Sequence, residues 1–159
     1  MAYLFDTNIF LRLAERNSEL REPVIDAIRL LRSRDEDLSY TPQIISEFWN
    51  VCTRPLSTRG GFGLNINQTE RKLVLIEKHF RILPDSLATF NEWRKLVKEK
   101  SIVGVQVHDA KIAASMSIHG VRNLLTFNSS DFKRFEFVKA VDPRALTEGW
   151  SEDPDLEIV

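Results

Sequence analysis

The sequence predicts an α/β protein built on a central, mostly parallel sheet of about five strands. Three observations lead to this prediction. The first is that short apolar runs recur along the chain, at about residues 2–5, 38–40, 80–83, 123–127 and 137–141. The second is that segments with the helical spacing of apolar residues separate these runs, which is typical of β-α-β units with parallel strands. The third is that the first run is continuous rather than alternating, as in strands buried on both faces.

Length and composition indicate one globular domain. The chain has 159 residues, of which 43% are hydrophobic and 28% charged, enough for a sizeable core. No apolar run approaches the ~18 residues that span a bilayer, and the first residues lack the features of a signal peptide. We therefore expect a cytoplasmic protein without membrane contact. The single cysteine, Cys52, excludes an internal disulfide framework and a zinc site built on several thiolates.

Charge is distributed unevenly along the chain. From residue 142 onward six acidic residues accompany one arginine, whereas residues 1–141 contain 21 basic and 17 acidic residues. This shift suggests a folded domain over residues 1–142 and an acidic C-terminal tail over residues 143–159. The mildly basic body permits a polyanionic partner without requiring one.

Helices are predicted from apolar spacing and from the residues at their ends. Thr41 is the expected cap of one helix and Pro42 its first residue. Cys52 and Trp93 are expected to lie in the core. Residues 55–67, which include three glycines, form either a mobile lid over a substrate or a plain linker. The predicted helices cover residues 9–13, 22–33, a segment from 42 onward, 68–79, a segment from about 87 to 97 and one from about 109 to 119.

Asp6 follows the first predicted strand directly. Open parallel sheets bind their ligands at this carboxyl end of the strands. Asp6 is also followed by Thr7 and Asn8, and all three residue types are common helix caps. The stretch alone therefore leaves two interpretations open, in which Asp6 either caps the next helix or belongs to a ligand site.

Three further acidic residues occupy comparable positions. Glu47 lies in the helix after the second strand, Asp109 lies in the first turn of a later helix, and Asp131 follows the fourth strand by a few residues. Because the carboxyl ends of parallel strands share one edge of the sheet, all four carboxylates can converge on one cleft. For Glu47, a surface position on an amphipathic helix is the alternative.

Four carboxylates without a histidine or cysteine cluster favour Mg²⁺, with Mn²⁺ as a substitute, over zinc. Without a cation, the packed carboxylates would repel one another and take up protons. A divalent ion coordinates phosphate oxygens and lowers the pKa of a bound water. The predicted reaction is the hydrolysis of a phosphodiester by metal-activated water, with either one or two ions.

The segments around these acids together resemble the PIN domain. They read Phe5-Asp6-Thr7-Asn8, Ser46-Glu47-Phe48, His108-Asp109-Ala110 and Leu125-Thr126-Phe127-Asn128-Ser129-Ser130-Asp131-Phe132. In this order and spacing they are similar to the VapC-type toxins of type II toxin–antitoxin pairs, over about residues 2–141. The resemblance implies a three-layer α/β/α sandwich and a Mg²⁺-dependent endoribonuclease. It also implies three partners, namely an RNA substrate, a cognate antitoxin and a second copy of the chain in a homodimer.

The resemblance also implies roles for individual residues. Asp6, Glu47 and Asp109 would form the core of the catalytic and metal-binding site. The fourth position falls on Asn128 or Asp131, and we favour Asp131 as the fourth acid with Asn128 as a polar helper.

Neighbouring residues would support this site. Thr7 would hold a metal-bound water or orient Asp6, and the capping role would pass to Thr7 or Asn8. Arg12, one turn beyond Asn8, could point toward the site and contact RNA.

Three other functions compete with a toxin nuclease. A haloacid-dehalogenase-like phosphatase also begins with a strand and an aspartate, but it requires a second aspartate where this chain has Asn8. A non-catalytic domain that binds RNA or protein would retain the fold without the chemistry. A PIN nuclease of RNA processing would share the site and differ only in its biological role.

Overall fold

A five-stranded parallel sheet organises the fold. The computed structural model describes residues 1–151, so the part of the predicted acidic tail from 152 to 159 lies outside the described residues. The strand order is β3-β2-β1-β4-β5, and every neighbouring pair is parallel. The α/β prediction is confirmed, although the sheet is parallel throughout and three strands are shorter than expected. The strands are β1 (Ala2–Phe5), β2 (Asp37–Tyr40), β3 (Arg81–Ile82), β4 (Asn123–Leu125) and β5 (Lys139–Val141).

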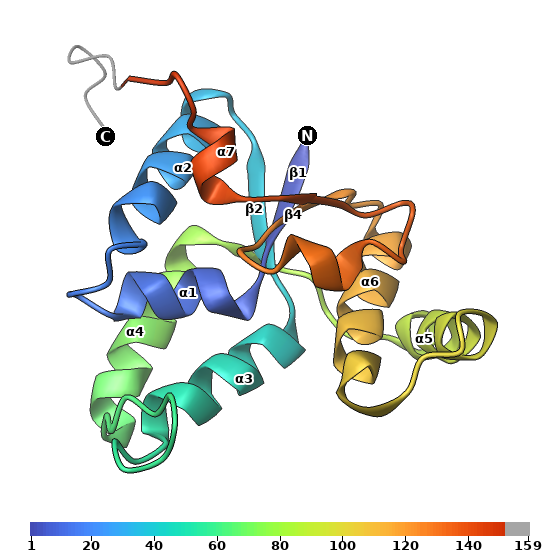
Figure 1. Cartoon of the computed structure of the whole chain (residues 1–159), viewed down its shortest axis with the longest axis horizontal. Coiled ribbons are helices and arrows are strands. Elements are labelled where there is room, and N and C mark those ends of the chain that lie inside the picture. Colours follow the sequence, from blue (N-terminus) through green and yellow to red (C-terminus); the bar gives the residue numbers. More distant parts are fainter. Residues whose placement is uncertain (152–159) are drawn as a thin grey trace.

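Helices cover both faces of the sheet. The chain runs from β1 to β2 to β3 in one direction and then crosses to β4 on the other side of β1. Because such crossovers are right-handed, α1 to α4 lie on one face and α5 and α6 on the other, as Figure 1 shows. The helices of the described chain are α1 (Thr7–Ala14), α2 (Arg21–Ser33), α3 (Pro42–Thr53), α4 (Ile66–His79), α5 (Leu87–Glu99), α6 (Val107–His119) and α7 (Pro143–Leu146).

The helix ends follow the sequence with one correction. Thr41 caps α3 by accepting the backbone N–H of Ile44, and Pro42 is the first helical residue, as predicted. The cap of α1 is Asp6 and not Thr7 or Asn8, because the Asp6 side chain accepts the N–H of Thr7, which already belongs to the helix. Asp6 is therefore the single residue between the end of β1 and the start of α1.

The core lies between the sheet and the helices. Leu4, Phe5 and Leu124 are fully buried, and Phe5 packs edge-on against Phe80, with the ring centroids 5.0 Å apart. Cys52 is buried in this core, as predicted. The sequence predicts Trp93 there as well, but this side chain is only partly buried and packs at the margin of the core.

The loop between α3 and α4 folds back on the end of α3. The N–H groups of Phe62 and Leu64 donate to the carbonyls of Val51 and Cys52. A Cβ atom at Gly61 would stand 2.3 Å from the carbonyl oxygen of Pro55, so only glycine fits there. These contacts favour the linker interpretation of the loop over the lid.

Part of the predicted tail belongs to the folded body. Helix α7 packs against α2, so residues 143–146 adjoin the main domain. Among the described helices, none is both long and apolar enough to cross a bilayer.

Candidate active site

Asp6 lies where the sheet changes its direction of winding. Strands β1 and β4 are neighbours, and the connections that follow them leave toward opposite edges of the sheet. Ligands of open α/β sheets bind at such a switch point, beyond the carboxyl ends of the strands. The backbone N–H of Asp6 donates to the carbonyl of Leu125 at 3.0 Å, which ties the start of α1 to the end of β4.

The carboxylate of Asp6 is buried and held by three hydrogen bonds. Its Oδ1 accepts the N–H of Thr7 at 2.7 Å, and its Oδ2 accepts Nδ2 of Asn8 and the hydroxyl of Thr126, each at 2.7 Å. Only 7% of the residue is exposed. A carboxylate offers about four acceptor positions, so roughly one is left for another ligand.

Burial raises the pKa of Asp6 to about 6. The hydrogen bonds from Thr126 and Thr7 lower this pKa, whereas the negative charges of Glu47 and Asp109 raise it further. Two acidic side chains from distant parts of the sequence therefore interact electrostatically with Asp6.

Thr126 and Asn8 form a second link between β4 and α1. The side-chain carbonyl of Asn8 accepts the N–H of Phe127, and its amide donates to the Thr126 hydroxyl, both at 3.1 Å. The same hydroxyl accepts the N–H of Asn128 at 3.0 Å. Because it also donates to Asp6, all hydrogen-bonding positions of this hydroxyl are used and its orientation is fixed.

Glu47 projects from α3 toward the start of α1. The Thr7 hydroxyl donates to its Oε2 at 2.6 Å, and Nε2 of Gln43 donates to its Oε1 at 2.8 Å. The same Gln43 nitrogen bonds the carbonyl of His108 at 3.1 Å, which joins α3 to the first turn of α6. Glu47 is therefore held in place by polar partners rather than lying on a free surface.

Asp109 lies close enough to Asp6, Glu47 and Asp131 for their charges to interact. Asp109 is half-buried in the first turn of α6, and burial raises its pKa, with further contributions from the charges of Asp131 and Glu47. Arg134 and His108 lower that pKa. Asp131 is exposed and belongs to the short helical turn η2 (Ser129–Phe132).

The four acids approach one another without forming a closed cage. Within residues 1–151, no three carboxylate, imidazole or thiol side chains converge tightly enough to hold a metal ion as they stand. An all-oxygen set in which neighbouring negative charges raise the pKa values of Asp6 and Asp109 nevertheless suits Mg²⁺, which retains several waters and needs only one or two direct carboxylates.

Arg12 and Asn128, which are predicted to support the site, are engaged differently from the four acids. Arg12, in the last turn of α1, pairs at 2.6 Å with Glu15, the residue that caps the C-terminal end of the same helix. Asn128 is exposed, and its described bond to the site is the backbone N–H that Thr126 accepts.

Sequence reasoning gave no role to Thr126 or Gln43. Thr126 carried a usable signal, since a threonine that follows Leu124 and Leu125 marks the end of a buried strand. Gln43 lies one helical turn before Glu47, a spacing that brings two side chains together. Its contact with His108 depends on the packing of α3 against α6, which local sequence does not reveal.

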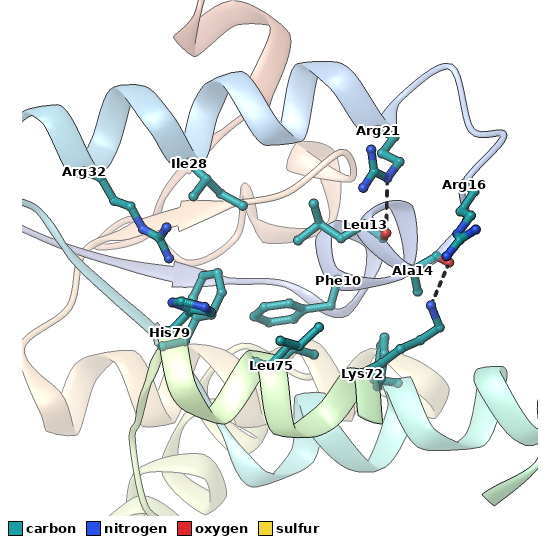
Figure 2. A pocket seen from close by; sticks show the side chains of 13 residues that line it. Phe10, Leu13, Ala14, Arg16, Arg21, Ile28, Arg32, Lys72, Leu75 and His79 are labelled. Carbon is teal, nitrogen blue, oxygen red and sulfur yellow. Dashed lines mark hydrogen bonds between the residues drawn. The ribbon is translucent and has the colours of Figure 1, made fainter. Parts of the chain in front are cut away.

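A separate cavity of about 410 Å³ lies between α1, α2 and α4 (Figure 2). Its apolar surface includes Phe10, Ile28 and Leu75, and none of the described residues that line it is acidic. Two of its cations are anchored at the end of α1, since Arg21 donates to the carbonyl of Leu13 and Lys72 to that of Ala14. The basic residues along the cavity are Arg16, Arg21, Arg32, Lys72 and His79.

The fold is that of a PIN domain. The PIN family model matches residues 3–138, and the chain belongs to this family. No curated protein sequence matches the chain.

Solved structures of toxin–antitoxin proteins share the fold. VapBC2 from Rickettsia felis, bound to a fragment of promoter DNA, is 18% identical with a TM-score of 0.66, over 89% of this chain and 98% of that one. VapBC-1 from nontypeable Haemophilus influenzae is 20% identical with a TM-score of 0.63, over 90% and 98%. VapC20 from Mycobacterium tuberculosis, a toxin that cleaves the sarcin–ricin loop, is 14% identical with a TM-score of 0.57, over 81% and 92%. At these identities the likeness shows the fold alone.

Proposed function

We propose that the chain is a Mg²⁺-dependent endoribonuclease, active also with Mn²⁺, that serves in the cytoplasm as the toxin of a toxin–antitoxin pair. One observation carries the proposal. Asp6 is buried at the switch point of the sheet, and the charges of Glu47 and Asp109 help to raise its pKa to about 6. Maintaining unneutralised carboxylates in such a place costs folding free energy, and a bound cation removes that cost.

The residues present fit a divalent cation. Asp6, Glu47, Asp109 and Asp131 would supply carboxylate oxygens, directly or through waters. The Oε1 atom of Gln43 is buried beside Glu47 and has no hydrogen-bond partner among the described residues, so a cation-bound water would satisfy it. When bound, the cation would polarise a phosphate oxygen and lower the pKa of a water.

The chain's own residues orient these ligands. Thr126, Asn8 and the N–H of Thr7 hold the Asp6 carboxylate from three directions. The Thr7 hydroxyl and Gln43 hold one oxygen each of Glu47. Such outer hydrogen bonds fix the direction of a ligand's free lone pairs and commonly matter nearly as much as the ligands themselves.

The structural neighbours support RNA as the substrate and a protein antitoxin as the partner. The basic residues along one cavity further support the antitoxin. Structural neighbours include a toxin that cleaves the sarcin–ricin loop and toxin–antitoxin complexes. The cavity of Figure 2 joins an apolar floor to a basic rim, which suits an amphipathic, acidic segment of an antitoxin. A homodimer, which the family likeness implies, stays a prediction.

The decisive experiment compares the purified full-length chain with its Asp6→Asn variant on single-stranded RNA. We expect cleavage with Mg²⁺ or Mn²⁺, none with excess EDTA, and a loss of about 100-fold or more in the variant. Asp26→Asn, an acid-to-amide change on α2 that does not touch the site, serves as the matched control.

Two outcomes would overturn the proposal. Equal cleavage by the wild type and Asp6→Asn would remove Asp6 from the site. RNA binding without cleavage under either metal would make the chain a non-catalytic binding module.

A further inference from the structure

A cleft of about 430 Å³ opens next to Glu47, between α3, α5 and α6. Gln43 forms part of its wall and donates both to Glu47 and to the carbonyl of His108, which also lines the cleft. Gln43 therefore links the wall of this cleft to Glu47 of the candidate active site. Its lining residues are Pro42, Gln43, Ser46, Asp85, Trp93, Val107, His108 and Lys111.

The rings of Phe90 and Trp93 extend the lining of the cleft along α5. A second hollow of about 330 Å³ shares Asp85, Trp93 and Lys111 with the first and adds Phe90. The indole N–H of Trp93 donates to the carbonyl of Val107 at 2.9 Å, which fixes the ring in the wall. Phe90 is 49% exposed, and its ring lies 5.9 Å from that of Trp93 at an interplanar angle of 34°. We call the two hollows together the base cleft.

An ion pair crosses the base cleft. Nζ of Lys111 lies 3.1 Å from Oδ2 of Asp85, and both side chains are 42% exposed. Ion pairs this exposed contribute little to stability, so each partner can exchange the other for a ligand group. The cleft thus offers a strong acceptor and a strong donor side by side, next to exposed aromatic carbon.

This combination matches the chemistry of a nucleobase. Single-stranded RNA is commonly bound by stacking bases on aromatic side chains and by hydrogen bonds to the base edges. Guanine is the base that presents two N–H donors beside a carbonyl acceptor on one edge. Asp85 can accept the two N–H groups, and the Lys111 ammonium can donate to the carbonyl.

We propose that the base cleft binds one nucleotide of the RNA, with its base against Phe90 and Trp93, and that the Asp85–Lys111 pair selects guanine. The inference rests on the proposed function, because it names a substrate subsite of the same nuclease. It places the selected base beside the acidic group that would act on a neighbouring phosphodiester.

The test measures binding by NMR on the full-length wild-type chain without added metal. The chain contains three tryptophans, and the indole N–H signal of Trp93 is assigned by its loss in Trp93→Phe. The four ribonucleoside 5′-monophosphates contain no phosphodiester to be cleaved, so titration with them reports binding alone. We expect guanosine monophosphate to shift the Trp93 signal saturably and at least about 5-fold more tightly than the others.

Variants separate stacking from edge recognition. Phe90→Ala should weaken the binding of all four nucleotides by about 10-fold. Leu87→Ala, an exposed residue of the same helix outside the cleft lining, should leave binding unchanged. Asp85→Asn should remove the preference for guanine while the stacking contribution persists.

Three results of the titration would overturn the inference. The Trp93 signal does not move with any nucleotide, it moves equally with inorganic phosphate, or it moves with protein concentration alone because a second copy covers the cleft. If RNA is cleaved normally but Phe90→Ala changes nothing, the subsite fails while the nuclease stands. If nucleotides bind as expected but no RNA is cut, the nuclease fails and the base-binding site remains.

Discussion

The hydroxyl of Thr126 donates a 2.7 Å hydrogen bond to Oδ2 of Asp6, across 120 residues of sequence. The same hydroxyl accepts N–H groups from Asn8 and Asn128. One side chain at the end of β4 is therefore hydrogen-bonded both to Asp6 and to Asn8 in the first turn of α1. This hydrogen bond lowers the pKa of Asp6, in opposition to burial. Thr126 therefore helps to keep Asp6 ionised at the pH where it would bind a cation.

Thr126→Val tests this relationship. Valine preserves the shape of the side chain but cannot donate, so the pKa of Asp6 should rise above about 6. We expect metal-dependent cleavage to fall by about 10-fold or more at pH 6, with a smaller loss at pH 8, because a higher pH restores the carboxylate. The measurement is a pH profile of kcat/KM on RNA.

Thr69→Val is the matched control, since Thr69 is equally buried but its hydroxyl donates to the carbonyl of Asn65, the N-cap of its own helix α4. It should leave the pH profile in place. An equal loss at every pH in Thr126→Val would instead indicate general disruption of the site.

The raised pKa of Asp6 also predicts how stability depends on pH without metal. In the folded chain this pKa is about 6 against 3.8 for an unperturbed aspartate, so the folded state holds the proton more tightly. The free energy of unfolding contributed by Asp6 is then fully present below pH ~4 and is lost as the pH rises to ~6, by roughly 3 kcal/mol. Urea unfolding in EDTA, with Asp6→Asn as reference, measures this difference.

Mg²⁺ should reverse that loss. The cation competes with protons for the same oxygens, so added Mg²⁺ should stabilise the wild type more at pH 7.5 than at pH 5. Asp6→Asn should gain less from Mg²⁺ at either pH. A wild-type chain whose stability ignores Mg²⁺ at pH 7.5 would contradict a metal site at Asp6.

The order of strands and helices followed from sequence because its signals are local. The apolar run before Asp6 and the Thr41-Pro42 pair each specify their own element, and both predictions are confirmed. The predicted cap of α1, Thr7 or Asn8, is wrong because Asp6, Thr7 and Asn8 are all good caps, and the choice depends on where the strand ends. The contact of Gln43 with His108 depends on tertiary packing, which the local sequence does not show. The position of Arg12 depends on its ion pair with nearby Glu15, which competes with the acidic site for the guanidinium.

The choice between Asp131 and Asn128 as fourth site residue can be decided by substitution. The charge of Asp131 raises the pKa of Asp109, whereas the side chain of Asn128 is exposed and its backbone N–H makes the described contact. Asp131→Asn should therefore lower metal-dependent cleavage by about 10-fold, and Asn128→Ala by much less. Titrating Mg²⁺ for each variant shows whether the loss lies in metal affinity. The reverse order would assign the fourth position to Asn128.

Charge on the cavity of Figure 2 should control binding of the antitoxin that we propose as partner. Arg16 and Arg32 are exposed at its rim, so Arg16→Glu with Arg32→Glu should preserve the fold and repel an acidic segment. We expect the Kd to rise by about 10-fold or more, with a smaller effect at high salt. RNA cleavage by the free chain should change little, because neither residue contacts the acidic group.

Arg94→Glu with Lys98→Glu changes the net charge equally at exposed positions of α5, away from this cavity, and should leave antitoxin affinity unaltered. Equal weakening by both pairs would show that overall charge, and not this cavity, governs the association. An unchanged Kd in the cavity pair would place the antitoxin elsewhere on the chain. Only selective weakening by the cavity pair fits a partner that inserts acidic and apolar side chains between α1, α2 and α4, since that cavity joins a basic rim to an apolar floor.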